Sequence, residues 1–417
     1  MHCGRSPLTL AMKLGQPRCH VFADGEDFIV FLPDERLLMR TNAAKAREFQ
    51  ACASDKSFAQ ESGMPPRRLN WAHVDRVVVM CGNQCRLNCR YCLPNHETPL
   101  VAPDSSFCGQ ALRAILERAA SSGPLTVGFL GIGEPTVPWQ AFTESVCEVE
   151  AAASAFCRPL QLTLCTDGQL SASRRRWLCE RIHLIDVSLD GPPLIHNRQR
   201  PRKDGMDAFT EPAMLIREAC AAGRQVRVRT TVTAATVQMM PALVQYFCDL
   251  FGNQITIVFA AMTEVGRPGD YCVAPEPHQF AKCFGLALDR GVECGVDVIH
   301  PAIGMTALLS DPYDEANRLV CLLPDHTIAR HNEPFWSLEA RRCKSSVFGR
   351  FTDHLELDED AFFQSLDGMY PPRCRTCACA GGCAGHPSSW GWDPDNPGDA
   401  DCDIHRHVLA EMLRRLV

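Results

Sequence analysis

Three cysteines near residue 90 have the type and spacing needed to hold a redox-active metal cluster. Cys85, Cys89 and Cys92 follow the apolar run at 77–79 in a C-x3-C-x2-C pattern, and Tyr91 directly precedes the last of them. Three thiolates can bind three irons of a cubane cluster and leave the fourth iron open for chemistry. A structural zinc site would want a fourth protein ligand nearby. The spacing therefore favours an iron–sulfur cluster, with a zinc loop or three unrelated buried thiols as the alternatives.

This loop resembles the signature of the radical S-adenosylmethionine (radical SAM) enzymes, in which an aromatic residue stands where Tyr91 stands. The resemblance implies that Cys85, Cys89 and Cys92 hold a [4Fe–4S] cluster. It also implies that SAM binds the open iron through its amino and carboxylate groups. Cys81, just before the loop, is expected to be a strand-end thiol and no ligand.

Two motifs further along the chain match the order of SAM-binding elements in that family. Gly131, Gly133 and Glu134 resemble the Gly-Gly-Glu-Pro element that holds the amino group of SAM, although Ile132 departs from its commonest form. Glycines at such a place let the backbone approach a ligand closely. Thr166 opens a Thr-Asp-Gly string that resembles the family's Thr-Asn-Gly. Each motif alone would usually be an ordinary turn, so their order carries the argument.

Two later strands carry the remaining expected SAM contacts. Ser188 and Asp190, in Ser-Leu-Asp-Gly, have groups suited to ribose hydroxyls. Arg229 lies in Arg-Thr-Thr-Val-Thr, which resembles the family's fifth-strand element, and the resemblance implies a charge-assisted contact with the SAM carboxylate. The basic segment 196–205 resembles the family's continuation after Ser-Leu-Asp-Gly, although such segments are usually only solvated.

A second group of cysteines lies near the C-terminus and resembles the SPASM extension, which holds auxiliary iron–sulfur clusters in radical SAM peptide-modifying enzymes. This resemblance implies that one [4Fe–4S] cluster is held by Cys374, Cys377, Cys379 and Cys402. It implies most of another on Cys321, Cys343 and Cys383. The spacings depart from the family's pattern, so the first auxiliary cluster could have an open site or a ligand such as His331. Zinc is the alternative for this region, because C-x2-C alone fits it.

Length and composition narrow the class of protein. The chain has 417 residues, is 46% apolar and carries a formal net charge of −7, so its overall charge gives no argument for nucleic-acid binding. No apolar run reaches membrane-spanning length, and the N-terminal 19 residues lack an export signal pattern, so a cytoplasmic location is expected. The 24 cysteines indicate metal ligands and small buried side chains in place of a disulfide scaffold.

Alternating strand-like and helix-like segments predict how these residues are positioned. Repeated β–α units imply a parallel sheet, and right-handed crossovers curl it into a partial barrel with its chemistry at the C-terminal strand ends. The fold class is therefore α/β: a partial (β/α)6 TIM-like radical SAM barrel, a small N-terminal α+β module and a Cys-rich C-terminal SPASM-like domain. The expected boundaries are 1–70, 71–300 and 301–417. The expected barrel strands are 75–81, 125–131, 160–166, 183–189, 225–233 and 254–261.

The resemblance implies a radical SAM oxidoreductase acting as a peptide maturase. Such an enzyme cleaves SAM to a 5′-deoxyadenosyl radical and modifies a ribosomally made precursor peptide, often by a crosslink. The N-terminal module resembles a short leader-peptide recognition domain. The expected partners are the precursor peptide and a reductant such as flavodoxin or ferredoxin. Three alternatives stay open: a formylglycine-forming sulfatase maturase, a SPASM oxidoreductase acting on a small molecule, and a non-catalytic zinc protein. The sequence does not identify a catalytic acid or base.

Overall fold

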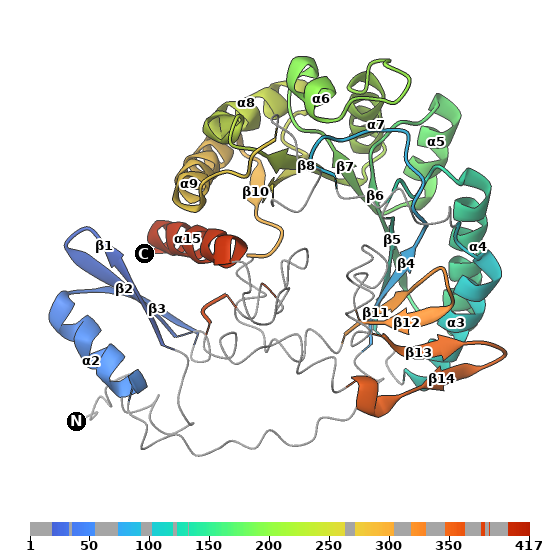
Figure 1. The fold of residues 1–417 in the computed structure, drawn as a ribbon, viewed down its shortest axis with the longest axis horizontal. Helices are drawn as coiled ribbons and strands as arrows, with labels where there is room; N and C mark the ends of the chain where they lie inside the picture. Colours follow the sequence, from blue (N-terminus) through green and yellow to red (C-terminus); the bar gives the residue numbers. More distant parts are fainter. Residues whose placement is uncertain are drawn as a thin grey trace.

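The N-terminal module is a three-stranded antiparallel sheet with one covering helix (Figure 1). Its strands are β1 (His20–Asp24), β2 (Asp27–Leu32) and β3 (Leu37–Thr41), and its helix is α2 (Ala43–Ser54). The sequence predicted a small α+β module here. Asn42 caps its helix, because Asn42 Oδ1 accepts from Lys45 N at 3.0 Å. This computed structural model describes residues 19–32, 36–54, 74–92, 102–119, 123–131, 133–262, 272–303, 318–330, 347–362, 377–379, 383 and 399–417.

Six parallel strands form the body of the second sheet, and all six were predicted within two residues of their bounds. They are β4 (Arg76–Met80), β5 (Leu125–Leu130), β6 (Leu160–Thr166), β7 (Leu184–Ser188), β8 (Gln225–Val232) and β9 (Ile255–Ala261). They lie in chain order and pair in parallel, as right-handed β–α units require. A seventh parallel strand, β10 (Asp297–Ile299), extends this edge beyond the prediction.

Helices cover the outside of the curved sheet, as Figure 1 shows. The helices alternate with the strands and bury apolar faces, for example Leu112 and Ile115 of α3 and Val146 and Val149 of α4, against it. The helices are α3 (Ser105–Arg118), α4 (Trp139–Ala155), α5 (Ala172–Arg181), α6 (Pro193–Gln199), α7 (Thr210–Ala221), the 3-10 turn η3 (Val237–Met239), α8 (Met240–Phe251) and α9 (Pro277–Cys294).

Four strands predicted by no pattern extend the other edge of the same sheet. Strand β11 (Leu319–Leu322) pairs in parallel with β4, and β12 (Thr327–Ala329), β13 (Val347–Phe351) and β14 (Leu355–Leu357) follow as antiparallel neighbours. The order of the eleven strands is β10-β9-β8-β7-β6-β5-β4-β11-β12-β13-β14. These four strands therefore continue the barrel sheet with residues that the sequence assigned to the C-terminal domain at 301–417.

The last helix is α15 (Asp399–Leu416). It packs against α9, and Arg415 Nε binds Asp289 Oδ1 at 2.8 Å. On its other side Arg414 Nη2 donates to Ala23 O of β1 at 3.0 Å. Helix α15 thus joins the barrel to the N-terminal module. None of the described helices is long and apolar enough to cross a membrane.

Candidate radical SAM site

The cysteine loop lies at the C-terminal ends of the barrel strands, as predicted. It follows β4, and its Cys85, Cys89, Tyr91 and Cys92 pack together around the buried Leu87. Backbone bonds from Asn88 N to Pro201 O at 2.7 Å and from Arg90 N to Gln199 O at 2.9 Å fasten it to the segment after β7. The three thiols predicted as ligands are therefore gathered in one place.

Burial changes the acidity of these thiols. It raises the pKa of Cys89 to about 12 and outweighs the opposing effect of Arg200, and it raises the pKa of Cys85 still further, with Asp167 adding to the rise. Without metal, both thiols are thus neutral near pH 7, so a metal that binds them must displace their protons. Among the described residues, no three His, Cys, Asp or Glu side chains are placed so that they could hold a single metal ion together. A cubane differs in that each cysteine binds its own iron.

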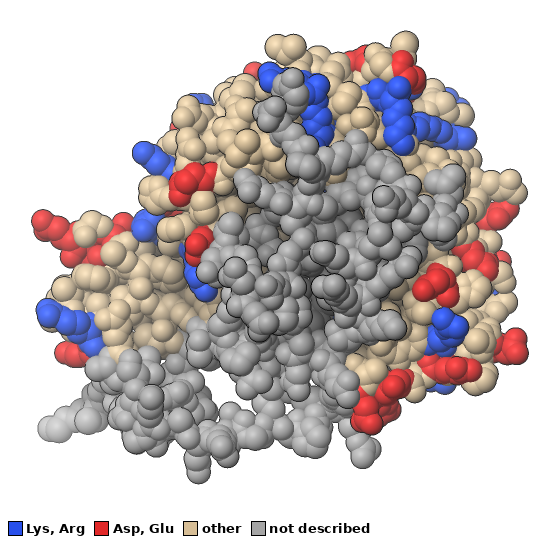
Figure 2. Space-filling view, viewed as in Figure 1, with Lys and Arg blue, Asp and Glu red and all other residues tan. Residues whose placement is uncertain are grey.

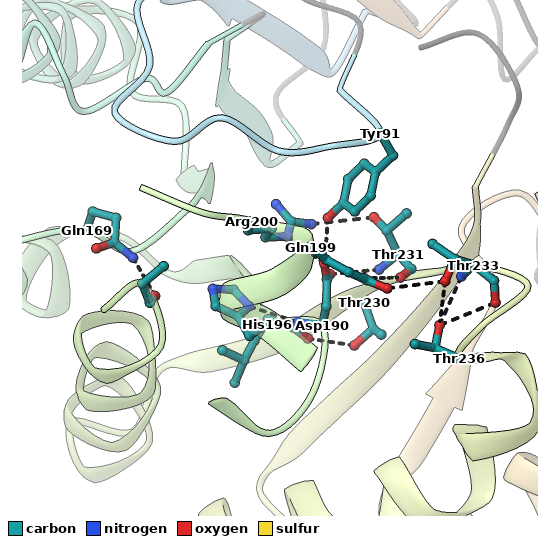
Figure 3. Close-up of polar contacts among 12 residues, drawn as sticks. Tyr91, Gln169, Asp190, His196, Gln199, Arg200, Thr230, Thr231, Thr233 and Thr236 are labelled. Atoms are coloured by element: carbon teal, nitrogen blue, oxygen red, sulfur yellow. Dashed lines mark hydrogen bonds and ion pairs between the residues drawn. The ribbon is translucent and has the colours of Figure 1, made fainter. Parts of the chain in front are cut away.

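A buried carboxylate holds the third-cysteine end of this loop in place (Figure 3). Asp190 is 0% exposed, and its Oδ2 accepts from Tyr91 OH at 2.6 Å, from Gln199 Nε2 at 2.8 Å and from Arg200 Nε at 3.0 Å. Its Oδ1 accepts from Thr231 N at 3.1 Å. Burial by itself would raise the pKa of Asp190, but the charges of Arg200 and His196 and the hydrogen bonds from Arg200 and Tyr91 together outweigh it, and the pKa is lowered.

The contact of Asp190 with a ribose stays a prediction, and the network limits how it could form. The Asp190 side chain has no exposed surface and its two oxygens already accept four hydrogen bonds from the protein, so a ribose hydroxyl would have to displace one of those donors. The sequence missed the roles of Tyr91 and Arg200 in this network. The available signal was the aromatic position before the last cysteine, together with a carboxylate that ends a buried strand.

The glycine loop after β5 packs directly on the cysteine loop. Glu134 N donates to Gln84 O at 2.6 Å, and a Cβ added to Gly133 would lie 2.0 Å from the same carbonyl oxygen. A Cβ on Gly131 would lie 3.0 Å from Gly133 O. Glycine is thus required at 133 for the two loops to approach each other, and Ile132 lies outside the described residues.

Glu134 and Asp167 form a buried pair of carboxylates beside this contact. Glu134 Oε1 accepts from Thr136 Oγ1 and from Thr166 Oγ1, each at 2.7 Å, and Oε2 accepts from Asp167 N at 2.5 Å. Burial, followed by the charge of Glu134, raises the pKa of Asp167 well above its usual range. Asp167 Oδ2 is buried and has no hydrogen-bond partner among the described residues.

Two further predicted contacts lie on neighbouring strands. Ser188 ends β7 and pairs with Arg229 of β8 in the sheet register. Within the described part of the chain, neither the Arg229 guanidinium nor the Ser188 hydroxyl has a hydrogen-bond or ion-pair partner, so each is available to a ligand. An unpaired guanidinium, two glycines without room for side chains and an unpaired buried carboxylate oxygen together fit a ligand that carries an amino and a carboxylate group.

The C-terminal cysteines are partly described. Cys377 and Cys379 share a hydrogen bond between their side chains, and Cys383 N donates to Cys379 O at 2.7 Å. The charges of Cys377 and Cys402 both raise the pKa of Arg406 in α15. The hydrogen bond from Cys379 lowers the pKa of Cys377 to about 5, with Arg406 assisting. Cys321 lies apart from this group in β11, packed with Met80, Leu323 and Ala329. Cys343, Cys374 and His331 lie outside the described residues.

Comparison with solved structures places this architecture among known folds. It superposes on anSMEcpe with bound AdoMet and Cp18Cys peptide at a TM-score of 0.62, with 17% identity over 82% of this chain and 97% of that chain. The protein has the radical SAM fold. Streptococcus suis SuiB bound to the precursor peptide SuiA matches at a TM-score of 0.51, with 11% identity over 88% of this chain and 93% of that chain.

Sequence comparison finds relatives that are similar over part of their length. A cysteine-type anaerobic sulfatase-maturating enzyme of Clostridium perfringens ATCC 13124 is 27% identical over 153 residues, which cover 36% of this radical SAM-fold chain and 39% of the relative. One from C. perfringens strain 13 is 24% identical over 239 residues, covering 55% and 61%. The matches thus span less than two thirds of these relatives, and no family model matches the chain.

Proposed function

We propose that this protein is a radical SAM enzyme that modifies a peptide. The observation that carries the proposal is the joint placement of the three-cysteine loop, the glycine loop and the unpaired Arg229 at one end of the parallel barrel. Parallel barrels place their chemistry at that end. Two of the structural neighbours were solved with a peptide bound, which supports a peptide as the substrate class.

Different residues of this chain would hold the cluster, bind SAM and fix the cysteine loop. Cys85, Cys89 and Cys92 would hold the [4Fe–4S] cluster, while Glu134 and Arg229 would bind the amino and carboxylate groups of SAM. When bound, SAM supplies a 5′-deoxyadenosyl radical that removes a hydrogen atom from the substrate. The Tyr91–Asp190–Arg200 network would fix the loop, and the buried strand ends would exclude water.

The finer proposal is that the product is a crosslink or another oxidative change in a ribosomally made precursor. Its support from the sequence is the group of C-terminal cysteines, which would hold one or two auxiliary clusters able to accept an electron after bond formation. Of these, Cys377, Cys379, Cys383 and Cys402 lie near one another in the described residues. A second candidate is a sulfatase maturase that forms formylglycine, favoured by the two curated relatives.

Anaerobic reconstitution tests the first step. Protein supplied with iron, sulfide, SAM and dithionite should form 5′-deoxyadenosine and methionine, and Cys89→Ser should form neither. If the wild-type protein were colourless after this reconstitution and had bound neither iron nor sulfide, the result would contradict the radical SAM proposal and favour the zinc alternative.

Mass spectrometry of two peptides separates the candidates for the second step. A precursor encoded beside this gene should lose hydrogens as a crosslink forms. A cysteine-containing sulfatase peptide would instead lose sulfur and gain oxygen if formylglycine were the product. Conversion of the sulfatase peptide alone would replace the first candidate with the second.

A further inference from the structure

A hollow beside the cysteine loop is lined by cationic and apolar side chains that the proposed chemistry does not use. Its volume is about 800 Å³, and it is bordered by Arg90, Pro193, Leu194, Asn197 and Arg198. Arg90 stands between two cysteines of the loop, and the other four residues belong to α6. The hollow therefore lies between α6 and the cysteine loop that would hold the cluster.

The surface of this hollow has the composition of a protein-docking site. Leu194 is 83% exposed, so its side chain gains little from burial on folding, and it borders the same hollow as the two arginines. Arg198 is exposed and has no hydrogen-bond or ion-pair partner in the part of the chain that the structure describes. An apolar anchor with a charged rim is the usual anatomy of a protein interface.

The charges around the hollow add to its positive potential. Lys203 is exposed and its Nζ donates to the backbone oxygen of Cys85 at 2.8 Å. Of the nearby acids, Asp204 is paired with Arg202 at 2.6 Å, and Asp207 accepts from Asn197 at 2.7 Å and from Thr210 N at 2.8 Å. Figure 2 shows Lys and Arg side chains along the edge that carries α6, with Asp and Glu side chains also present on it. The charged residues that border the hollow itself, Arg90 and Arg198, are both cationic in a chain whose net charge is −7.

We propose that the hollow formed by Arg90, Leu194 and Arg198 docks an acidic one-electron carrier protein of the flavodoxin or ferredoxin type. The proposal rests on the proposed function, in which the cysteine-held cluster needs one electron for each SAM cleaved. The carrier gives up that electron and is oxidised, and the cluster accepts it and is reduced. An acidic carrier is repelled by the molecule as a whole, so a local cationic patch is needed to steer it to the cluster loop.

Binding measurements test the surface without turnover. Oxidised, acidic flavodoxin is titrated into reconstituted protein at several salt concentrations. We expect Arg198→Glu to weaken binding about tenfold at low salt and to flatten its salt dependence, because a rim charge acts through steering. Leu194→Asp should weaken binding at all salt concentrations. Lys282→Glu reverses an exposed charge on the distant helix α9 and should bind as the wild type does.

A parallel assay separates failure of this proposal from failure of the proposed function. With dithionite as reductant, wild type, Arg198→Glu and Leu194→Asp should all form 5′-deoxyadenosine equally, whereas with reduced flavodoxin the two variants should be slower. Equal rates for all three with flavodoxin would overturn the docking site. An equal loss with dithionite would also overturn it and would assign the hollow to substrate. No product from wild type with dithionite would instead overturn the proposed function.

Discussion

At the scale of single residues, Tyr91 is the clearest link between the cysteine loop and the barrel. Its hydroxyl donates to buried Asp190, and the Arg200 Cζ lies 5.3 Å from its ring centroid. Tyr91→Phe keeps the ring and removes one donor to a carboxylate that stays buried, which should cost about 1–3 kcal/mol of unfolding free energy. We also expect faster loss of iron, because the loop end is less firmly held.

Chemical denaturation and the rate of iron release to a chelator measure these two effects. Tyr246→Phe is the matched control, since Tyr246 belongs to α8 and its ring packs against that of Phe247. An iron-release rate equal to that of wild type would show that Tyr91 does not fix the loop.

Asp167 should make stability depend on pH. Burial and Glu134 raise its pKa in the folded protein above the ordinary 3.8, so the folded state holds this proton more tightly than the unfolded chain does. The stability that this tighter proton binding adds to the folded state is fully present below about pH 3.8. It is lost as the pH rises through the pKa of Asp167 in the folded protein. Asp167→Asn removes the titration, so the cofactor-free variant should gain stability relative to wild type as pH rises.

Calorimetric Tm values at acid and neutral pH test this sign. Asp204→Asn should show the opposite trend, because the hydrogen bond from Arg202 lowers the pKa of the exposed Asp204 carboxyl to about 2. If the difference in Tm between Asp167→Asn and wild type stayed constant with pH, Asp167 would not hold the raised pKa.

The sequence anticipated which residues meet at the site better than it anticipated what each does. Local spacing located the cysteines, Glu134 and Arg229, because strand ends of a parallel sheet share one edge. It could not assign Asp190, because that role depends on Tyr91, 99 positions earlier in the chain, and on the buried Arg200. Burial and hydrogen-bond partners depend on the tertiary structure. An Asp at the end of a strand looks the same in the sequence whether it binds a ribose or fixes a loop.

At the scale of elements, the contact between the two loops should be intolerant of any side chain. Gly133→Ala places a Cβ 2.0 Å from the Gln84 backbone oxygen, which cannot move without displacing the cysteine loop. We expect a loss of about 1–3 kcal/mol in stability and poor retention of the cluster. The readouts are thermal unfolding and the iron content after reconstitution.

Gly109→Ala is the matched control for that variant. Its added Cβ would meet Glu148 Oε2 at 2.5 Å, and this flexible side chain on the neighbouring helix can turn away. Iron content should therefore match wild type. Full iron content in Gly133→Ala would contradict the close packing of the two loops.

Element prediction succeeded where the pattern is local and failed where pairing is distant. The strands β4 to β9 are apolar runs separated by helical patterns, so their type and order follow from the sequence. Strand β11 has four residues and β12 and β14 have three each, which is too short for a periodic signal. Their positions depend on pairing of Val320 with Val77, more than 200 residues away.

At the scale of the whole molecule, α15 connects the chain's two ends through a buried apolar face. Leu409 and Leu413 are 0% exposed and belong to the same hydrophobic cluster as Ile29 and Phe31 of β2. The ion pairs of Arg414 and Arg415 lie at the rim, where solvent weakens them. Stability should thus depend on the apolar face far more than on the rim charges.

Leu413→Ala should cost about 2–5 kcal/mol of unfolding free energy, because it removes buried methyl groups and leaves a cavity in the apolar cluster that α15 shares with the module and the barrel. Arg415→Ala should cost at most about 1 kcal/mol. Denaturant titration of both variants measures the difference, and limited proteolysis reports whether the N-terminal module becomes cleavable. Equal costs, or a protected module in Leu413→Ala, would show that the module is held to the barrel by contacts other than this face of α15.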